Sequence, residues 1–154
     1  MLVGISGHKN GLGKAFADQL PNVIGYDKLD SYNIKTDYTK IVESARNCDV
    51  FINNAYDGVG QILLHTELEK AWKHTDKLII NISSSTLSVY PTRNDQYAQV
   101  KRRLEKISRY ARCRCECIRV PLMNTNLVIG KKHALTHKIA PNVVAKAIIE
   151  WHIS

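Results

Sequence analysis

Residues 6–13 read Ser-Gly-His-Lys-Asn-Gly-Leu-Gly and follow directly on the apolar run Met1–Ile5. The apolar run predicts a short buried strand, and apolar residues recur at helical spacing from Leu12 to Leu20. Glycines between a strand and a helix let backbone amides approach a pyrophosphate closely, and the amino end of the helix adds a favourable dipole. The segment therefore predicts a phosphate-binding turn, although strand–glycine–helix turns also occur as plain structure.

Strand and helix signals alternate along the rest of the chain. Further strands are expected at 23–26, 32–34, 50–52, 77–82 and 115–120, and further helices around 41–45, 62–72, 100–111 and 141–151. Such alternation predicts an α/β fold of three layers, with a doubly wound parallel sheet of about six strands. Ligands bind such sheets at the carboxyl ends of the strands. The length of 154 residues suits one domain over 1–154.

Composition limits the class of protein. Hydrophobic residues make up 44% and charged residues 23%, and no apolar run approaches the ~20 residues that span a bilayer. No signal peptide is recognised, so a cytoplasmic protein without membrane contact is expected. The net charge is +8, but the cations are scattered apart from 101–103 and 131–132. A nucleic acid is therefore not the expected partner, and a phosphate-bearing small molecule is.

Asp27 ends the second expected strand, 14 residues after Gly13. A carboxylate at this position can accept hydrogen bonds from the adenosine ribose hydroxyls, and it repels a 2′-phosphate. This favours NAD over NADP, but Lys9 and Lys28 lie nearby in sequence and would reverse that preference. The alternative for Asp27 is a solvated strand end.

Tyr97 and Lys101 are four residues apart, so they share one face of a helix. A free phenol has a pKa near ~10 and is a poor base at neutral pH, whereas a neighbouring ammonium favours the phenolate and makes the pair a candidate acid/base. Ser84 lies 13 residues earlier, at the end of an expected strand, where a hydroxyl can donate to a substrate oxygen. Ser83 and Ser85 flank it, so the assignment is open by one residue.

These motifs together resemble the short-chain dehydrogenase/reductase family. The family's T-G-x-x-x-G-x-G loop stands here with Ser6 for threonine, its N-N-A-G segment reads Asn-Asn-Ala-Tyr at 53–56, and its serine and Y-x-x-x-K match Ser84, Tyr97 and Lys101. The resemblance covers Met1 to about Pro121 and resumes weakly at the last expected helix. It implies a Rossmann-type fold and hydride transfer between a nicotinamide and a small alcohol or carbonyl substrate.

The resemblance also assigns roles to residues. Tyr97 would exchange the hydroxyl proton, Lys101 would hold the nicotinamide ribose, and Ser84 would orient the substrate oxygen. The cofactor, NAD or alternatively NADP, would contact Gly7, Lys9, Asn10, Gly11, Leu12, Gly13, Asp27, Asp37, Asn53, Asn54, Ala55, Tyr97, Lys101 and Pro121. Asp37 would meet the adenine, and Asn53 and Ala55 would line the adenosine side.

The chain departs from the family pattern in ways that keep a second interpretation open. Against the family pattern we expect a strongly shortened member without the seventh strand, and there is no asparagine between Gly58 and Lys77, where relatives carry a fourth catalytic residue. The alternative is a dinucleotide-binding protein without catalysis, such as a sensor or an assembly subunit. Relatives form dimers or tetramers through two helices, and Ile62, Leu63 and Trp72 are candidates for such a contact.

Metal ligation is not expected from the histidines and cysteines. His133 and His137 are four residues apart but lack the glutamate of an H-E-x-x-H motif. Cys113, Cys115 and Cys117 alternate along an expected strand, which puts all three thiols on one face. They are interpreted as reduced apolar fillers and not as a zinc site.

Overall fold

A five-stranded parallel sheet organises the protein. The structure is a computed structural model that describes residues 1–123 and 139–154. The strands are β1 (Val3–Ser6), β2 (Val23–Tyr26), β3 (Val50–Asn53), β4 (Leu78–Ser84) and β5 (Arg114–Val120). Their order is β2-β1-β3-β4-β5, and every neighbouring pair is parallel. The winding reverses between β1 and β3, so a ligand is expected at the carboxyl ends of these two strands.

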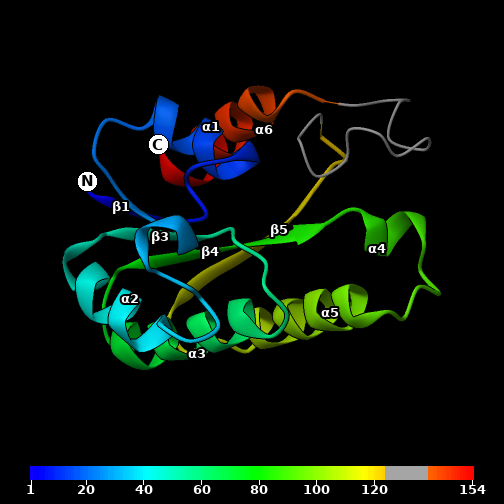
Figure 1. The fold of residues 1–154 in the computed structure, drawn as a ribbon, viewed down its shortest axis with the longest axis horizontal. Coiled ribbons are helices and arrows are strands. Elements are labelled where there is room, and N and C mark those ends of the chain that lie inside the picture. Colours follow the sequence, from blue (N-terminus) through cyan, green and yellow to red (C-terminus); the bar gives the residue numbers. More distant parts are fainter. Residues whose placement is uncertain (124–138) are drawn as a thin grey trace.

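Helices cover both faces of this sheet, as the alternating pattern predicts. The helices are α1 (Gly11–Gln19), α2 (Tyr38–Ser44), α3 (Gly60–Trp72), α4 (Thr86–Val89), α5 (Gln96–Arg109) and α6 (Pro141–Ile148). Short helical turns occupy Lys28–Asp30, Ala45–Asn47 and Ile149–Ile153. Figure 1 shows α1 and α6 on one face and α2, α3 and α5 on the other. The predicted three-layer, doubly wound α/β architecture is confirmed.

The side chains of the strands alternate between two apolar cores. Ile5, Ile52 and Ile80 face α1 and α6, whereas Phe51 and Ile79 face α2 and α3. All five are fully buried, which is the pattern of strands covered on both faces. The strands whose loops form the cavity described below are therefore packed on both faces of the sheet.

The strand expected at 32–34 does not form, so the described residues contain five strands and not six. Side chains satisfy the backbone of this segment instead: Asp37 Oδ2 accepts from the Asn33 amide at 2.9 Å, and Asn33 Oδ1 accepts from the Lys35 amide at 2.9 Å. Such local bonds compete with a sheet ladder. Ile34 is nevertheless buried, so its apolar side chain reaches the core from a loop.

Within the described residues the sheet ends at β5, which is an edge strand. Charged residues blunt this edge, because Arg114 and Arg119 are exposed and Glu116 pairs with His152. Trp72, a candidate for contact between subunits, is only 2% exposed and packs in the core. None of the helices in the described parts of the chain has the length and apolarity needed to cross a bilayer.

Candidate functional site

A cavity of about 600 Å³ opens at the carboxyl ends of β1 and β3. The predicted residues that line it are Gly7, Asn10, Gly11, Leu12, Asp27, Asn54, Ala55, Tyr97 and Lys101. Other lining residues are Tyr26, Lys28, Tyr32, Asn33, Ile34, Tyr56, Asp57, Ile82, Ser83, Val120 and Met123. The fold therefore brings the glycine loop and the Tyr–Lys pair, almost ninety residues apart in sequence, to one cavity.

The glycine loop has the backbone geometry of a close-approach turn. Gly7 and Gly11 adopt positive φ values of 72° and 54°, which side-chain-bearing residues rarely take. A Cβ at Gly13 would lie 2.0 Å from the Gly7 carbonyl oxygen, so α1 must begin directly against the loop. The Asn10 side chain makes no capping bond, and the first turn of α1 has no acidic residue. The amino end of α1 thus keeps free amides for an anion.

Ser6 ties the loop after β1 to the loop after β3. Its Oγ accepts hydrogen bonds from the backbone amides of Asn54 at 3.0 Å and Ala55 at 3.1 Å. In return, Asn54 Nδ2 donates to the Ser6 carbonyl oxygen at 3.2 Å. A serine in the family's threonine position therefore has a definite structural role: it fixes two walls of the cavity relative to each other.

Asp27 lies at the cavity with its carboxylate partly engaged. Its Oδ1 accepts from the Leu29 amide at 2.9 Å and caps the turn Lys28–Asp30, and the residue is 8% exposed. Lys28 lines the cavity beside it. Lys9 is directed elsewhere, because its Nζ donates to Asp30 Oδ1 at 2.5 Å. Lys9 and Lys28 are the two lysines expected to counteract the preference of Asp27 for NAD over NADP. Of these two, only Lys28 is among the residues that line the cavity.

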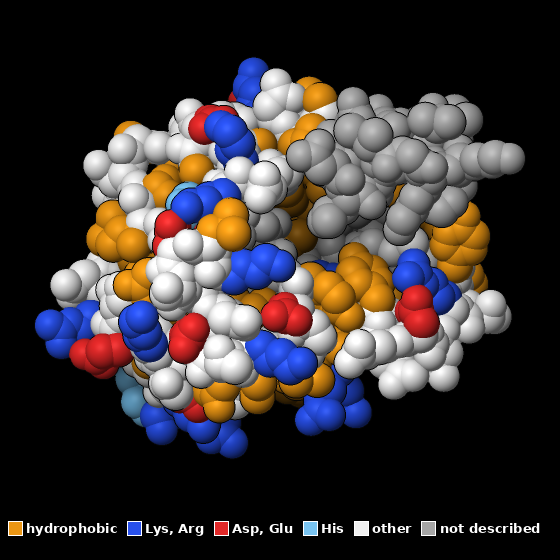
Figure 2. All heavy atoms as spheres, viewed as in Figure 1, with side chains coloured by type: hydrophobic (Ala, Val, Ile, Leu, Met, Phe, Trp, Pro, Cys, Tyr) orange, Lys and Arg blue, Asp and Glu red, His pale blue; other side chains and the backbone are white. Residues whose placement is uncertain are grey.

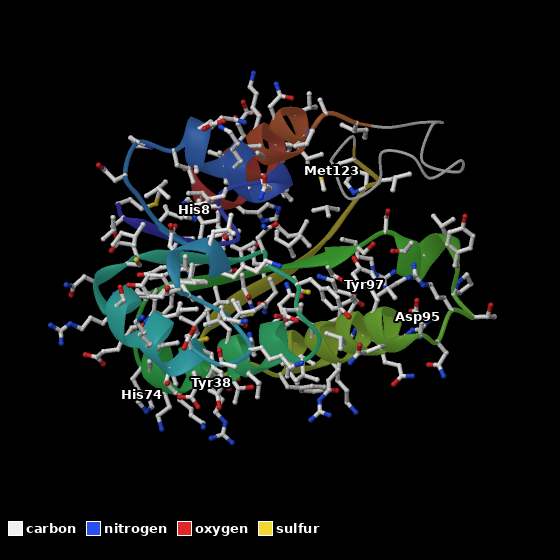
Figure 3. The ribbon with its side chains drawn as sticks, in the orientation of Figure 1. His8, Tyr38, His74, Asp95, Tyr97 and Met123 are labelled. Carbon is white, nitrogen blue, oxygen red and sulfur yellow. The ribbon has the colours of Figure 1, made fainter. Side chains whose placement is uncertain are left out.

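Helix α5 presents Tyr97 and Lys101 to the cavity, as their spacing predicts. The helix begins under a cap, in which Asp95 Oδ1 accepts from the Ala98 amide at 3.0 Å. Figure 3 shows Tyr97 near the start of α5, close to Asp95, and Met123 above it in this view, on the side of α6. Lys101 Nζ lies 5.4 Å from the centroid of the Tyr97 ring, within the range of cation–π attraction.

Tyr56 adds a second aromatic ring to this wall. Its ring meets that of Tyr97 edge-on, with 4.9 Å between centroids, and Lys101 Nζ lies 5.7 Å from its centroid. Loss of hydration and the nearby phenol of Tyr97 raise the pKa of Tyr56. Tyr56 stands where the family motif has glycine, and the sequence motif does not predict it as a lining residue.

Lys101 is buried to an extent that sequence spacing does not reveal. It is 3% exposed, and burial lowers its pKa to about 8, although Cys117 and Glu105 act in the opposite direction. Its Nζ donates to Gln61 Oε1 at 2.8 Å and to the Ile82 carbonyl oxygen at 2.7 Å. Gln61 is a functional candidate that the sequence analysis missed, because a glutamine beside Ile62 and Leu63 carries no motif.

Ser84 is not among the described residues that line the cavity. Its Oγ accepts from the Thr86 amide at 3.2 Å and contacts the Thr86 hydroxyl. Ser83 does line the cavity, and its Oγ donates to Glu105 Oε1 at 2.7 Å. Neighbouring strand residues face opposite sides of the sheet, and of these two serines the described lining includes Ser83 and not Ser84.

Five other predicted residues also lie outside the described lining: Lys9, Gly13, Asp37, Asn53 and Pro121. Gly13 packs under the loop, and Asp37 uses its carboxylate on the Asn33 amide. Asn53 is fully buried and bonds to Gln61 and Asn81. Gly13 and Asp37 thus contact two lining residues, Gly7 and Asn33, without lining the cavity themselves.

The cysteines lie as the alternation predicts, on one side of β5. Cys113 and Cys115 pack against the core formed with α2 and α3. Burial raises the pKa of Cys115 to about 12 and that of Cys117 to about 11, so both remain thiols at neutral pH. No cluster of three potential metal ligands occurs within residues 1–123 and 139–154, and His133 and His137 lie outside these ranges.

Comparison with known proteins identifies the fold. No family model matches the sequence, and no curated protein matches it either. Among solved structures, a short-chain dehydrogenase from Burkholderia cenocepacia in complex with NADP is 15% identical, with a TM-score of 0.76 over 96% of this chain and 82% of that one. A small-chain dehydrogenase in complex with NADPH is 16% identical, with a TM-score of 0.77 over 97% and 90%.

A third structure agrees with these two. The 3-ketoacyl-(acyl-carrier-protein) reductase from Brucella melitensis, complexed with NADH, is 16% identical, with a TM-score of 0.73 over 96% of this chain and 89% of that one. The chain therefore has the fold of the short-chain dehydrogenases/reductases, and the resemblance seen in the sequence motifs is confirmed at the level of fold. At sequence identities of 15% and 16%, structural similarity establishes the fold but not the activity.

Proposed function

We propose that this chain is an NAD(P)-dependent oxidoreductase of the short-chain dehydrogenase type, interconverting an alcohol and a carbonyl on a small-molecule substrate. The observation that carries the proposal is the shared cavity, in which the glycine loop, Asp27, Tyr97 and Lys101 meet. A site that only binds a nucleotide would need no more than the glycine loop and Asp27. A phenol and an ammonium on the same cavity wall add the means to move a proton.

The residues present fit a dinucleotide. Glycines with positive φ and an uncapped helix amino end suit the pyrophosphate, and the solved structures of the same fold include complexes with NADP, NADPH and NADH. Asp27 would accept from the ribose hydroxyls and favour NAD. Lys28 at the same wall would tolerate a 2′-phosphate, so NADP remains the alternative cofactor.

The chemistry divides between cofactor and protein. When bound, the nicotinamide supplies or accepts the hydride at the substrate carbon. In the reducing direction, the Tyr97 hydroxyl gives its proton to the substrate oxygen as the carbonyl becomes an alcohol, and a phenolate is left. The Lys101 ammonium, 5.4 Å from the centre of that ring, stabilises the negative charge. In the oxidising direction the phenolate takes the proton back.

One observation favours the alternative of a dinucleotide-binding protein without catalysis. Ser84, the hydroxyl expected to orient the substrate oxygen, bonds to Thr86 and is absent from the described cavity lining. A protein that only senses or carries a dinucleotide would keep the glycine loop and would not need this hydroxyl. Substrate binding would have to turn Ser84, or use Ser83, for the enzyme proposal to hold.

Calorimetric titration with NAD, NADH, NADP and NADPH tests the common basis of both functions. Micromolar binding of one pair is the expected result, and absence of binding to all four would remove both proposals. Tyr97→Phe then separates the two, because it removes only the phenolic proton. The expected result is a loss of turnover of about 100-fold or more with nucleotide binding retained.

The matched control is Tyr90→Phe, which removes the same hydroxyl from an exposed tyrosine outside the cavity lining. Turnover by the Tyr90→Phe protein is expected to equal that of the parent. Nucleotide binding without turnover of any tested alcohol or carbonyl by the parent would favour the non-catalytic alternative.

A further inference from the structure

The Lys101 ammonium is held by two neutral oxygens deep in the cavity wall. It has three N–H donors, and the Gln61 side-chain oxygen and the Ile82 carbonyl oxygen take two of them at 2.8 and 2.7 Å. The charged or titratable groups around it are Tyr97 and Glu105 on α5, Tyr56 after β3, and Cys117 on β5. Glu105 is itself engaged with Ser83 and Arg119. Residues 1–123 and 139–154 provide no third acceptor for this ammonium, and Lys101 lines the cavity.

Gln61 is itself fixed in one orientation. Its Nε2 donates to the Asn53 carbonyl oxygen at 2.7 Å and to the Ile82 carbonyl oxygen at 3.0 Å. Because both amide hydrogens have carbonyl acceptors, the amide oxygen must be the atom that faces Lys101. The side chain is fully buried, and Asn53 Nδ2 anchors its backbone carbonyl at 2.9 Å. Because the Gln61 amide is held in one orientation, its oxygen defines the position of the Lys101 ammonium that donates to it.

The preceding residue allows α3 to bring Gln61 this close. A Cβ on Gly60 would lie 2.8 Å from Ile34 Cγ1 and 3.0 Å from the Lys35 amide nitrogen. The first turn of α3 therefore packs directly on the loop before α2, which only glycine permits. This contact lies at the base of the same cavity, since Ile34 is one of its lining residues.

We propose that Gln61 is a positioning residue that holds the Lys101 ammonium beside Tyr97, with its free N–H directed into the cavity. The proposal rests on the function proposed above, to which it adds a residue that acts through Lys101. A neutral amide at this place fixes the ammonium without a counter-charge. Burial outweighs the opposing effects of Cys117 and the Glu105 carboxylate, so it lowers the pKa of Lys101 to about 8.

Two substitutions with opposite expected effects test this role. Gln61→Glu places one carboxylate oxygen 2.8 Å from Nζ, and its second oxygen replaces the nitrogen that donates to the Asn53 and Ile82 carbonyls. The Lys101 ammonium is then the group that stabilises the carboxylate, and an opposite charge at such range raises a lysine pKa by about 1–3. Gln61→Met keeps the size of the side chain but removes the acceptor, so the pKa of Lys101 is expected to fall below that of the parent. The pKa is read from the ¹³Cε signal of labelled lysine, assigned by its loss in Lys101→Arg.

The matched control is Gln99→Glu, on the exposed side of α5 two residues from Lys101. It adds the same charge without the contact, so the pKa of Lys101 is expected to stay close to that of the parent. An equal rise in Gln61→Glu and Gln99→Glu, or no change in either Gln61 variant, would overturn the proposal. If Gln61→Met does not fold, the comparison of the two glutamate variants decides alone.

This readout needs neither cofactor nor turnover, so it separates the two proposals. If the protein binds no nicotinamide nucleotide but the pKa of Lys101 still responds as stated, the proposed oxidoreductase function is refuted. The coupling between Gln61 and Lys101 is then retained. In an active enzyme, the alkaline limit of kcat is expected to move upward in Gln61→Glu together with the pKa. An unmoved alkaline limit beside a moved pKa would overturn the role of Gln61 in the reaction.

Discussion

Gly13→Ala tests the close contact on which the nucleotide loop depends. The added Cβ would lie 2.0 Å from the Gly7 carbonyl oxygen and 2.7 Å from its carbonyl carbon, whereas real Cβ contacts stay beyond 3.0 Å. The loop or α1 must therefore shift by about 1 Å. The obstructing atom is backbone, and Gly7 is held by its amide, which donates to the Tyr26 carbonyl oxygen at 2.7 Å. The overpacking cost is therefore expected near the upper end of the usual range, at about 3 kcal/mol.

Alanine offsets part of this cost, since it is favoured over glycine inside a helix by about 1 kcal/mol. The net destabilisation of Gly13→Ala is then about 2 kcal/mol, which lowers the melting temperature of a domain of this size by about 4–8 °C. The assay is thermal unfolding followed by circular dichroism, and nucleotide affinity should fall as the loop moves. Lys14→Ala, the next and exposed position of α1, is the control and should change stability by no more than about 0.5 kcal/mol. A Gly13→Ala protein as stable as the parent would refute the packing of α1 against Gly7.

Two further predictions concern charges at the cavity. Asp27→Ala is expected to lower the free energy of unfolding by about 1 kcal/mol, because the Leu29 amide loses its hydrogen-bond acceptor. It is also expected to shift the binding preference from NAD toward NADP. An unchanged ratio of the NAD and NADP affinities in paired titrations would contradict the role of Asp27. Between about pH 8 and 10.5, Lys101 in the unfolded chain keeps a proton that folded Lys101 has released. The parent protein is therefore expected to gain stability with rising pH relative to Lys101→Met. Urea-unfolding midpoints of the two proteins that run parallel across that range would refute the lowered pKa.

The features predicted correctly from sequence depend on local pattern. The glycine turn, the apolar strands and the pairing of Tyr97 with Lys101 each follow from spacing within one element. The segment 32–34 was predicted wrongly for a reason that is also local. Asn33 and Asp37 bond to nearby backbone amides, and the apolar side chain of Ile34 fills the core without a strand.

Helix α3 shows what pattern alone misses. The buried side chains are Gln61, Leu64, His65, Leu68 and Trp72, so two polar residues occupy the face that a hydrophobic pattern assigns to Ile62 and Leu63. Their partners come from β3, β4 and α5: Gln61 bonds to Asn53 and Lys101, and His65 to Asn81. No spacing within α3 reveals these partners, because they exist only once the sheet has formed.

The Tyr–Lys pair combines both kinds of information. Its four-residue spacing puts Tyr97 and Lys101 on one side of α5, but their surroundings differ: Tyr97 is half-buried at the opening, and Lys101 is buried one turn further in. Sequence reasoning treats the ammonium as a fixed positive charge that favours the phenolate. In the structure the burial of Lys101 makes that charge conditional on pH, because its proton leaves near pH 8. For the proposed chemistry we therefore expect an upper pH limit that follows from the burial of Lys101 beside Gln61, and not from the spacing of the pair.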